Sequence, residues 1–281
     1  MARLLPHEWL FGGFMLITWL RLVLMQGIIT ADALVFMACL LIAGYLAFRI
    51  QPHNTSTTWR VRLLFYPIAM NVLFQQMRTA VPAIQPSKFD MQLRVLDSTI
   101  LTDTPSFLLE SWVNPHLTDL FSFFYLLFFP YLLFSLIYYF IGDIRRLKAF
   151  VAGLFSLYGI GFLGYAMVPA AGPYLAFAHE FHVPLTGGML TQWNNDLVKM
   201  GSSGVDVFPS LHVAVSCFLL GFDFRHKRWR FLIYLLPCLG LWLSTIYLRY
   251  HYLTDVVVGW CLALFALWIA ERQYALERQS T

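Results

Sequence analysis

Residues 118–141 read TDLFSFFYLLFFPYLLFSLIYYFI, an apolar run in which Asp119 is the only charged residue. A helix needs about 20 mostly apolar residues to cross the hydrocarbon core of a bilayer. Seven more segments have a similar character, although two of them, 61–77 and 208–223, are short. The eight segments are 9–29, 32–49, 61–77, 118–141, 149–168, 208–223, 231–249 and 252–270. They predict an all-α, polytopic membrane bundle of about eight transmembrane helices.

The composition agrees with a membrane protein. The chain of 281 residues is 59% hydrophobic and only 12% charged, whereas a soluble domain carries about 25% charged residues. With half the usual share of charged residues, the chain cannot cover the water-exposed surface of a soluble protein of this size. A soluble enzyme, a disordered chain and a nucleic-acid-binding module are therefore excluded, and the membrane itself is the expected surroundings.

The distribution of Lys and Arg predicts the orientation. Clusters such as 145–148 and 225–230 fall in the even-numbered loops, counted along the eight segments, and few basic residues fall in the odd-numbered loops. Loops rich in Lys and Arg face the cytoplasm. Both termini are therefore expected to be cytoplasmic, and the two long loops, 78–117 and 169–207, to lie on the extracytoplasmic side.

A first polar motif, Arg249-Tyr-His251-Tyr-Leu-Thr-Asp255, stands where the seventh segment ends and the eighth begins. His251 and Asp255 are four residues apart, so they share one face of a helical turn. A carboxylate bound to one imidazole nitrogen fixes the tautomer and raises the basicity of the other nitrogen, as a nucleophilic histidine requires. Arg249 could place a positive charge beside the same ring. The alternative is an interfacial His–Asp pair that only closes a tight turn.

A second polar motif, Phe208-Pro-Ser210-Leu-His212-Val-Ala-Val, opens the sixth segment directly after a long outer loop. Proline suits a first helical turn, and Ser210 can cap it. Free N–H groups and the positive end of the helix dipole make such a start a site for anions, and His212 projects within one turn of it. The alternative is a capping serine beside an interfacial histidine that binds nothing.

Together the two motifs place two imidazoles, one of them backed by a carboxylate, on the same outer face as a helix start. No serine-hydrolase elbow, glycine-rich nucleotide loop or HExxH helix occurs in the chain. The combination suits attack on a phosphorus centre, in which one imidazole attacks, donors hold the phosphoryl oxygens and the second imidazole protonates the leaving oxygen.

The stretches 208–214 and 250–255 resemble the second and third signatures of the type 2 phosphatidic acid phosphatase superfamily. The closer resemblance is to the branch that holds the inositol phosphorylceramide synthases, which also carries a proline-rich segment like Val168-Pro-Ala-Ala-Gly-Pro173. The resemblance covers about residues 60–270. It implies a six-helix core at 60–271, two additional N-terminal transmembrane helices at 1–59 and a cytoplasmic tail at 272–281.

The resemblance also implies roles for the motif residues. His251 would be the nucleophile that forms a phosphohistidine, Asp255 its orienting carboxylate, and His212 the general acid for the leaving alcohol. Ser210 and nearby backbone N–H groups would hold phosphate oxygens. The family works without a metal or other cofactor, so no metal ligands are expected.

Three positions depart from the phosphatase pattern. Leu211 replaces a glycine, as in the synthase-like branch, Thr245 stands where an arginine is usual, and the stretch 158–175 lacks the Lys and Arg of the first signature. Three positive charges are thus missing from a site for a dianion. The best substitute is Arg249. Further candidates among the loop residues are Lys199, Arg78 and Arg94.

Several other polar residues allow weaker hypotheses. Asp97, Asp103 and Glu110 in the first long loop could orient an acceptor hydroxyl. His179 and His182 have the spacing of two metal ligands but are more typical of a solvated loop. The remaining residue of note is Arg21, inside the first segment, which we expect to snorkel or to pair internally.

The sequence thus predicts a membrane-embedded lipid phosphoesterase or phosphotransferase that acts on the extracytoplasmic face. Its substrate would be a phospholipid or lipid phosphate, and the acceptor would be water, a polyol or a lipid alcohol. A non-enzymatic transporter or flippase of phosphate-headgroup lipids is the alternative. Against that alternative, no helix interior carries the paired Gly and Pro breaks of a midplane transport site.

Overall fold

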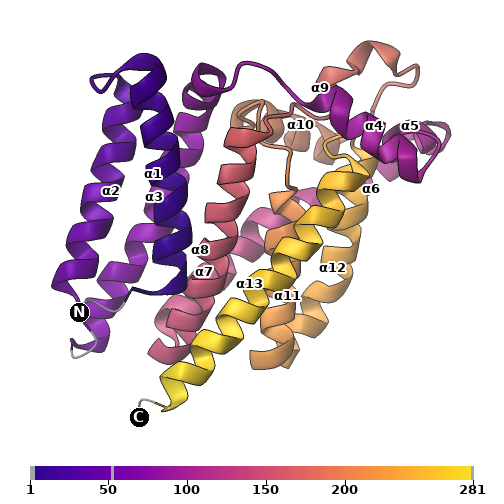
Figure 1. Ribbon diagram of the computed structural model, residues 1–281. Helices are drawn as coiled ribbons and strands as arrows, with labels where there is room; N and C mark the ends of the chain where they lie inside the picture. Colours follow the sequence, from indigo (N-terminus) through magenta and orange to yellow (C-terminus); the bar gives the residue numbers. More distant parts are fainter. Residues whose placement is uncertain (1–3, 52–53, 280–281) are drawn as a thin grey trace. The chain divides into compact units, whose positions relative to one another are not determined.

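The computed structural model describes residues 4–51 and 54–279. Within these residues helices are the regular secondary structure, and the β-type pairing is limited to an isolated bridge between Ala170 and Asp206 (Figure 1). The expected all-α fold is confirmed. Residues 1–3 and 52–53 of the predicted N-terminal segment, and 280–281 of the predicted tail, lie outside the described residues.

Every predicted segment is helical. The long helices are α1 (Pro6–Gln26), α2 (Ala31–Arg49), α3 (Ser56–Ile84), α6 (Pro115–Leu126), α7 (Phe128–Ile141), α8 (Ile144–Met167), α11 (Leu211–His226), α12 (Arg228–Tyr247) and α13 (Leu253–Gln279). The two long loops contain α4 (Asp90–Ile100), α5 (Pro105–Leu108), η1 (Glu110–Trp112), α9 (Pro173–Ala176), η2 (Ala178–Glu180) and α10 (Met189–Gly201). Much of each predicted loop is therefore structured.

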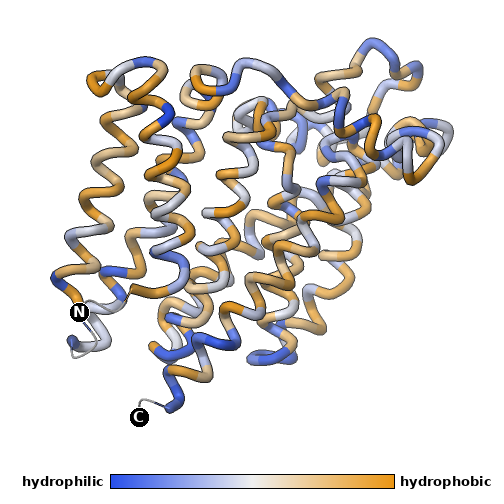
Figure 2. Tube along the Cα trace, viewed as in Figure 1, coloured by the Kyte–Doolittle hydropathy of each residue, from blue (hydrophilic) through white to orange (hydrophobic). Residues whose placement is uncertain are grey.

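Six helical spans among the described residues are long and apolar enough to cross a membrane: α1, α2, the α6–α7 pair, α8, α12 and α13. Apolar residues predominate along these helices, and hydrophilic residues gather at their ends and in the loops (Figure 2). The chain is an integral membrane protein, but the predicted count of about eight spans is not confirmed. Helix α3 contains Arg60, Arg62 and Arg78, and the 16 residues of α11 reach about 24 Å, less than the roughly 30 Å core.

The predicted span 118–141 is broken into α6 and α7 by its own sequence. Pro130 has no N–H to donate to the carbonyl of Leu126, and its ring crowds that carbonyl. Helix α6 accordingly ends at Leu126 and α7 begins at Phe128. The start of α6 is fixed by Asn114, whose side chain accepts the N–H of Leu117 at 3.0 Å, with Pro115 in the first helical position.

The chain divides into two compact units. The first comprises 1–87, 136–167 and 264–281, and the second comprises 88–135 and 168–263. Helices α7 and α13 contribute residues to both. Both histidine motifs belong to the second unit.

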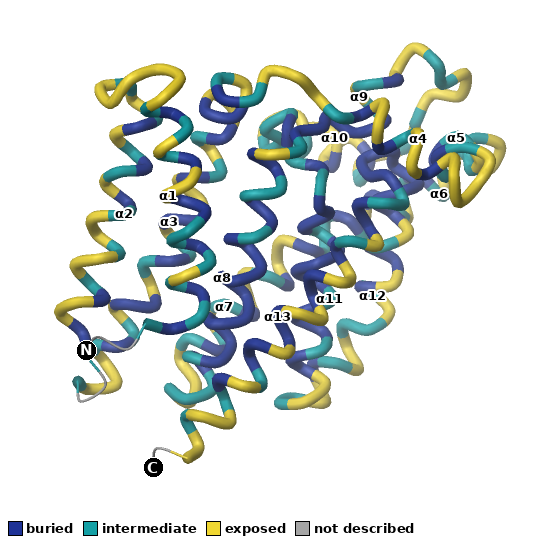
Figure 3. The backbone as a smooth tube through the Cα atoms, in the orientation of Figure 1, coloured by how far each residue is buried: buried dark blue, intermediate teal, exposed yellow. Residues whose placement is uncertain are grey.

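In the first unit, α8 packs on α1 and α3, and α1 also packs on α2. Most of α8 is buried, in contrast to α2 (Figure 3). Gly159 lets α1 approach closely, because a Cβ there would come within 2.6 Å of the backbone nitrogen of Phe11. Arg21 pairs internally, as expected, since it donates to the carbonyls of Ala166 at 3.1 Å and Ile84 at 2.9 Å.

A buried ion pair fastens α1 to α3. The guanidinium of Arg62, 1% exposed, binds the carboxylate of Glu8 through Nε at 2.7 Å and also through Nη2. It donates further to the carbonyl of Ile50. The phenol of Tyr66 lies 3.4 Å from the same carboxylate. Both charges are thus paired within the helix bundle.

We expect Arg62→Ala to destabilise the protein by about 3–5 kcal/mol, because it leaves the Glu8 carboxylate buried without a counter-charge. The double variant Glu8→Gln/Arg62→Met removes both charges and is expected to lose much less stability. Thermal unfolding in detergent measures both. A single variant that unfolds no earlier than the double variant would contradict the role given to this pair.

Candidate active site

The two histidine motifs meet at the starts of helices α11 and α13. Ser210 is the N-cap of α11, as predicted, and its hydroxyl accepts the N–H of Val213 at 3.4 Å. Its own N–H donates to the carbonyl of Asp255 in the first turn of α13 at 3.0 Å. Gly259, one turn further along α13, faces the carbonyl of Ser210 so closely that a Cβ would lie 2.7 Å from that oxygen. The two helix starts are therefore in backbone contact.

This contact brings the two imidazoles together. The ring centroids of His212 and His251 are 5.8 Å apart, with 62° between the ring planes. Nδ1 of His251 lies 2.9 Å from Oδ2 of Asp255. His251 is 2% exposed and Asp255 is fully buried. Among the described residues nothing binds Nε2 of His251, so the nitrogen opposite the carboxylate is the one left for a ligand.

The backbone around His251 is held by the end of α12. The carbonyl of Thr245 accepts the N–H groups of Tyr250 at 3.0 Å and His251 at 3.1 Å. Such a sharp turn needs an unusual backbone conformation, and Arg249 has φ = 66°. The carbonyl of Arg249 accepts the N–H of Tyr174 at 2.8 Å. The proline-rich segment 168–173 therefore leads directly onto the turn that presents His251.

His212 is surrounded by aromatic side chains of α6 and α7. Its Nε2 lies 3.0 Å from the hydroxyl of Tyr125, and the ring of Phe128 is 4.7 Å away, centroid to centroid. Nδ1 of His212 is buried and has no partner among the described residues. Tyr125 is a site residue that the sequence did not reveal, because it lies within the apolar run 118–141, which predicts only a transmembrane helix. The available signal was the hydroxyl of Tyr125, a polar group within a run rich in phenylalanine.

A second polar group adjoins Tyr125. The amide of Asn194 on α10 donates to the hydroxyl of Tyr250 at 2.7 Å, and Tyr250 packs against the rings of Tyr125 at 4.9 Å and Tyr174 at 5.2 Å. Asn194 is fully buried, and its Oδ1 has no partner within the described chain. Tyr250 and Asn194 therefore extend, from Tyr125, a chain of neutral polar side chains that begins at His212.

The predicted phosphate-binding residues have different positions. Ser210 lies at the helix start between the two histidine motifs. The guanidinium of Arg249 donates to the carbonyl of Val183 at 2.6 Å and lies 3.8 Å over the ring of Phe181, and its Nε is buried without a partner in the described residues. Lys199 is exposed near the end of α10, and no described residue binds it.

The two other basic candidates, Arg94 and Arg78, do not supply a free positive charge to the second unit. Arg94 is bound to Asp103 at 2.9 Å and to Glu180 at 2.7 Å. Hydrogen bonds from Arg94 hold the pKa of the Asp103 carboxyl below its usual value. Arg78 belongs to the first unit. The missing positive charges of the phosphatase pattern are thus not replaced by Arg94.

The acidic residues that were expected to orient an acceptor hydroxyl are engaged with the protein itself. Glu110 accepts the N–H groups of Val183 at 2.8 Å and His182 at 2.6 Å. These backbone donors, Val183 first, lower the pKa of the Glu110 carboxyl. Its carboxylate also lies 3.6 Å from Arg249. Asp97 is fully buried and binds the start of α13.

The His179–His182 pair does not join a larger set of ligands. Both side chains are largely exposed, and their acidic neighbours are Glu180 and Glu110 respectively. No group of three or more His, Cys, Asp or Glu that could hold a metal ion occurs among residues 4–51 and 54–279.

The arrangement brings a carboxylate-backed imidazole, a second imidazole and the donors of a helix start together. A carboxylate-backed imidazole has the form of an activated nucleophile. A second imidazole nearby can exchange a proton with a leaving or attacking oxygen. The start of α11 adds backbone N–H groups and a positive dipole end, which favour an oxyanion. These parts suit transfer of a group that carries negative charge.

We expect Gly259→Ala to destabilise the protein, by about 1–3 kcal/mol, because the new methyl group would press on the carbonyl of Ser210 and force α11 and α13 apart. Gly44→Ala in α2 is the matched control, since a Cβ there meets nothing within 4 Å. In a helix interior that change is expected to be neutral or stabilising by up to about 1 kcal/mol. Opposite signs in thermal unfolding support the close approach, and equal effects would contradict it.

A family model described as the PAP2 superfamily matches residues 91–269. The matched range is more than half of the 281 residues and includes most of α4, both histidine motifs and most of α13. Comparisons with curated proteins and with solved structures give no significant match.

Proposed function

Because the chain belongs to the PAP2 superfamily, whose members are typically lipid phosphatases or phosphotransferases, we propose that it transfers a lipid-borne phosphoryl group through a phosphohistidine on His251. Two distances carry this proposal. Nδ1 of His251 lies 2.9 Å from the carboxylate of Asp255, and the ring centroids of His251 and His212 are 5.8 Å apart. Two-step transfer needs both features: an imidazole that binds a carboxylate, and a second imidazole close to it.

In the first step the lone pair of Nε2 of His251 attacks phosphorus. The bond between phosphorus and the leaving oxygen of the lipid breaks as the N–P bond forms. His212 supplies the proton that the leaving oxygen takes up, so a neutral alcohol departs. Asp255 stabilises the positive charge that the His251 ring acquires.

In the second step the acceptor attacks the phosphohistidine. The acceptor hydroxyl gives its proton to His212 as its oxygen bonds to phosphorus, and the N–P bond breaks. Water as the acceptor gives a phosphatase, and a polyol or a lipid alcohol gives a head-group transferase. Leu211 between Ser210 and His212 supports the synthase-like branch of the superfamily, but membership of that branch does not fix the acceptor.

The phosphoryl oxygens would be held mainly by neutral donors and by the helix start. We propose Ser210 and backbone N–H groups at the start of α11 for this role. The Nε–H of Arg249, which has no partner among the described residues, and Lys199 from α10 would assist. In a buried site such preorganised donors stabilise developing negative charge strongly. The distribution of basic residues in the sequence supports an extracytoplasmic position for this site, with both termini in the cytoplasm.

The wild-type protein is expected to turn over short-chain phosphatidic acid or a lipid phosphodiester, and His251→Ala to lose at least about a thousandfold in rate. Asp255→Asn should lose about a hundredfold or more, because the imidazole loses its orienting charge. His179→Ala, an exposed histidine, is the matched control and should keep its activity. Phosphate release and mass spectrometry of lipid products, with water, inositol and glycerol in competition, give both the rate and the acceptor.

An unchanged rate in His251→Ala would contradict the proposed nucleophile. Lipid binding without turnover in every variant, wild type included, would instead favour a transporter or flippase.

The proposed role of His212 predicts that the rate lost in His212→Ala depends on the leaving group of the substrate. A general acid matters when the departing alcohol is a poor leaving group and matters little when it is a good one. We therefore expect His212→Ala to lose about 10²–10⁴-fold in kcat/KM, which reports the first step alone, with an alkyl phosphate and less than about tenfold in kcat/KM with p-nitrophenyl phosphate. Equal losses with both substrates would show that His212 does not act as the acid.

A further inference from the structure

Helix α4 presents a row of buried residues to the rest of the second unit. Asp90, Leu93 and Asp97 are the buried residues of this helix, and their spacing of three and four residues places them on one face. Two carboxylates on a buried face are costly unless each is fully hydrogen-bonded. Their partners therefore indicate what this helix does.

Asp97 binds the first turn of α13. Its Oδ2 accepts the N–H of Leu253 at 2.9 Å, and its Oδ1 accepts the N–H of Thr254 at 2.9 Å and the hydroxyl of Thr254 at 2.7 Å. A helix start has N–H groups without partners inside the helix, and an acidic side chain there is favourable. Asp97 thus caps α13 from a different helix, immediately after His251.

Asp90 binds two other parts of the same region. Its carboxylate accepts the N–H of Ala171 at 3.0 Å, the N–H of Gly172 at 2.9 Å and the hydroxyl of Tyr252 at 2.9 Å. Tyr252 is the residue that follows His251. One carboxylate therefore joins the proline-rich segment to the histidine motif.

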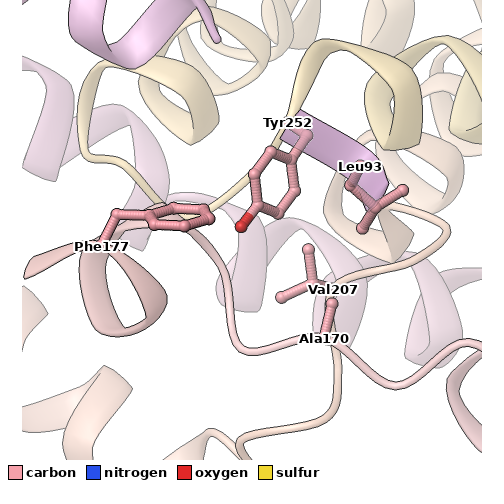
Figure 4. Packing of buried hydrophobic residues seen from close by; sticks show 5 residues of the cluster. All are labelled: Leu93, Ala170, Phe177, Val207 and Tyr252. Carbon is pink, nitrogen blue, oxygen red and sulfur yellow. The ribbon is translucent and has the colours of Figure 1, made fainter. Parts of the chain in front are cut away.

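Leu93, which lies between Asp90 and Asp97 on α4, belongs to an apolar cluster that strengthens this attachment. Figure 4 shows Tyr252 lying near Phe177 on one side and Leu93 on the other, with Ala170 and Val207 close by. The cluster is buried, and Tyr252 and Ala170 are fully so. Two residues between His251 and Asp255, Tyr252 and Leu253, are therefore fixed to α4.

We propose that Asp97, with Asp90 as its partner on α4, is a positioning residue for His251 and Asp255. The inference rests on the proposed function and extends it to a helix outside both histidine motifs. Asp97 does not touch the reacting atoms. It fixes the start of α13, and thereby the distance and angle between the two imidazoles.

The geometry of Asp97 disfavours the other role considered for it, which is binding of an acceptor hydroxyl. The residue is fully buried, and both of its oxygens accept bonds from α13. A residue that binds the acceptor changes KM for that acceptor when it is replaced. A residue that positions the nucleophile changes the rate of the chemical step instead.

The experiment compares Asp97→Asn, Asp97→Ala, Thr254→Val and Thr254→Ser. We expect kcat to fall about tenfold in Asp97→Asn and about a hundredfold in Asp97→Ala, with KM for lipid and acceptor within about twofold of wild type. Thr254→Val should fall about three- to tenfold, and Thr254→Ser, which keeps the hydroxyl, should recover wild-type kcat. Asp103→Asn is the matched control, because Asp103 binds Arg94 and not α13, and its kcat should stay within about threefold.

The double variant Asp97→Asn/Thr254→Val separates the two roles. If Asp97 acts through α13, the two losses overlap and the double variant is little worse than Asp97→Asn alone. Multiplicative losses, or an effect mainly on KM for the acceptor, would overturn the inference. Because Thr254→Val removes only one hydroxyl, the overlap can be read even if Asp97→Ala fails to fold.

Hydrogen exchange of the Leu253 and Thr254 amides gives a readout that does not depend on activity. We expect exchange at these amides to be at least about tenfold faster in Asp97→Asn than in wild type or Asp103→Asn. Unchanged exchange would overturn the inference whatever the kinetics. A wild type without any turnover would reject the proposed function, and the exchange result would then still decide whether Asp97 fixes the start of α13.

Discussion

The hydrogen bond from the N–H of Ser210 to the carbonyl of Asp255 is the contact on which the site depends. It joins the first turns of two helices that are 40 or more residues apart in sequence, and the absence of a side chain at Gly259 allows the approach. The position of each imidazole is then determined by its own helix, because His212 lies in the first turn of α11 and His251 just before α13. This backbone contact brings the two imidazoles together, and the carboxylate of Asp97 then holds the start of α13 in place.

Two charged residues of the long loops, Arg94 and Glu110, are bound within the loops. Arg94 is paired with Asp103 and Glu180, and Glu110 holds the backbone at Val183 near Arg249. The hydroxyl of Tyr125 binds His212, the ring of Tyr125 packs on Tyr250, and Tyr250 in turn binds Asn194. An anion would therefore be bound here by oriented dipoles more than by lysines and arginines. This is consistent with the loss of basic residues at the positions of the first and third signatures.

Much of this account could be predicted from the sequence, because it depends on local patterns. Apolar runs predicted the helices, the four-residue spacing predicted the His251–Asp255 pair, and Ser210 was recognisable as an N-cap. The count of about eight spans is not confirmed because α3 is rich in polar residues and α11 is short. Tyr125, Asp90 and the role of Asp97 could not be predicted, since each acts on a residue more than 80 positions away in the chain. Nothing in the local pattern of α4 distinguishes a carboxylate that caps a distant helix from one that faces solvent.

The most direct test of the central claim is an experimental structure of the protein with orthovanadate, which adopts the trigonal bipyramidal shape of a phosphoryl group in transfer. The account predicts vanadium bonded to Nε2 of His251, its equatorial oxygens at the start of α11, and the ring of His212 beside the opposite apical oxygen. Vanadate bound elsewhere, or the two rings separated by more than about a nanometre, would contradict the shared pocket, because proton transfer requires hydrogen-bond distances of about 3 Å.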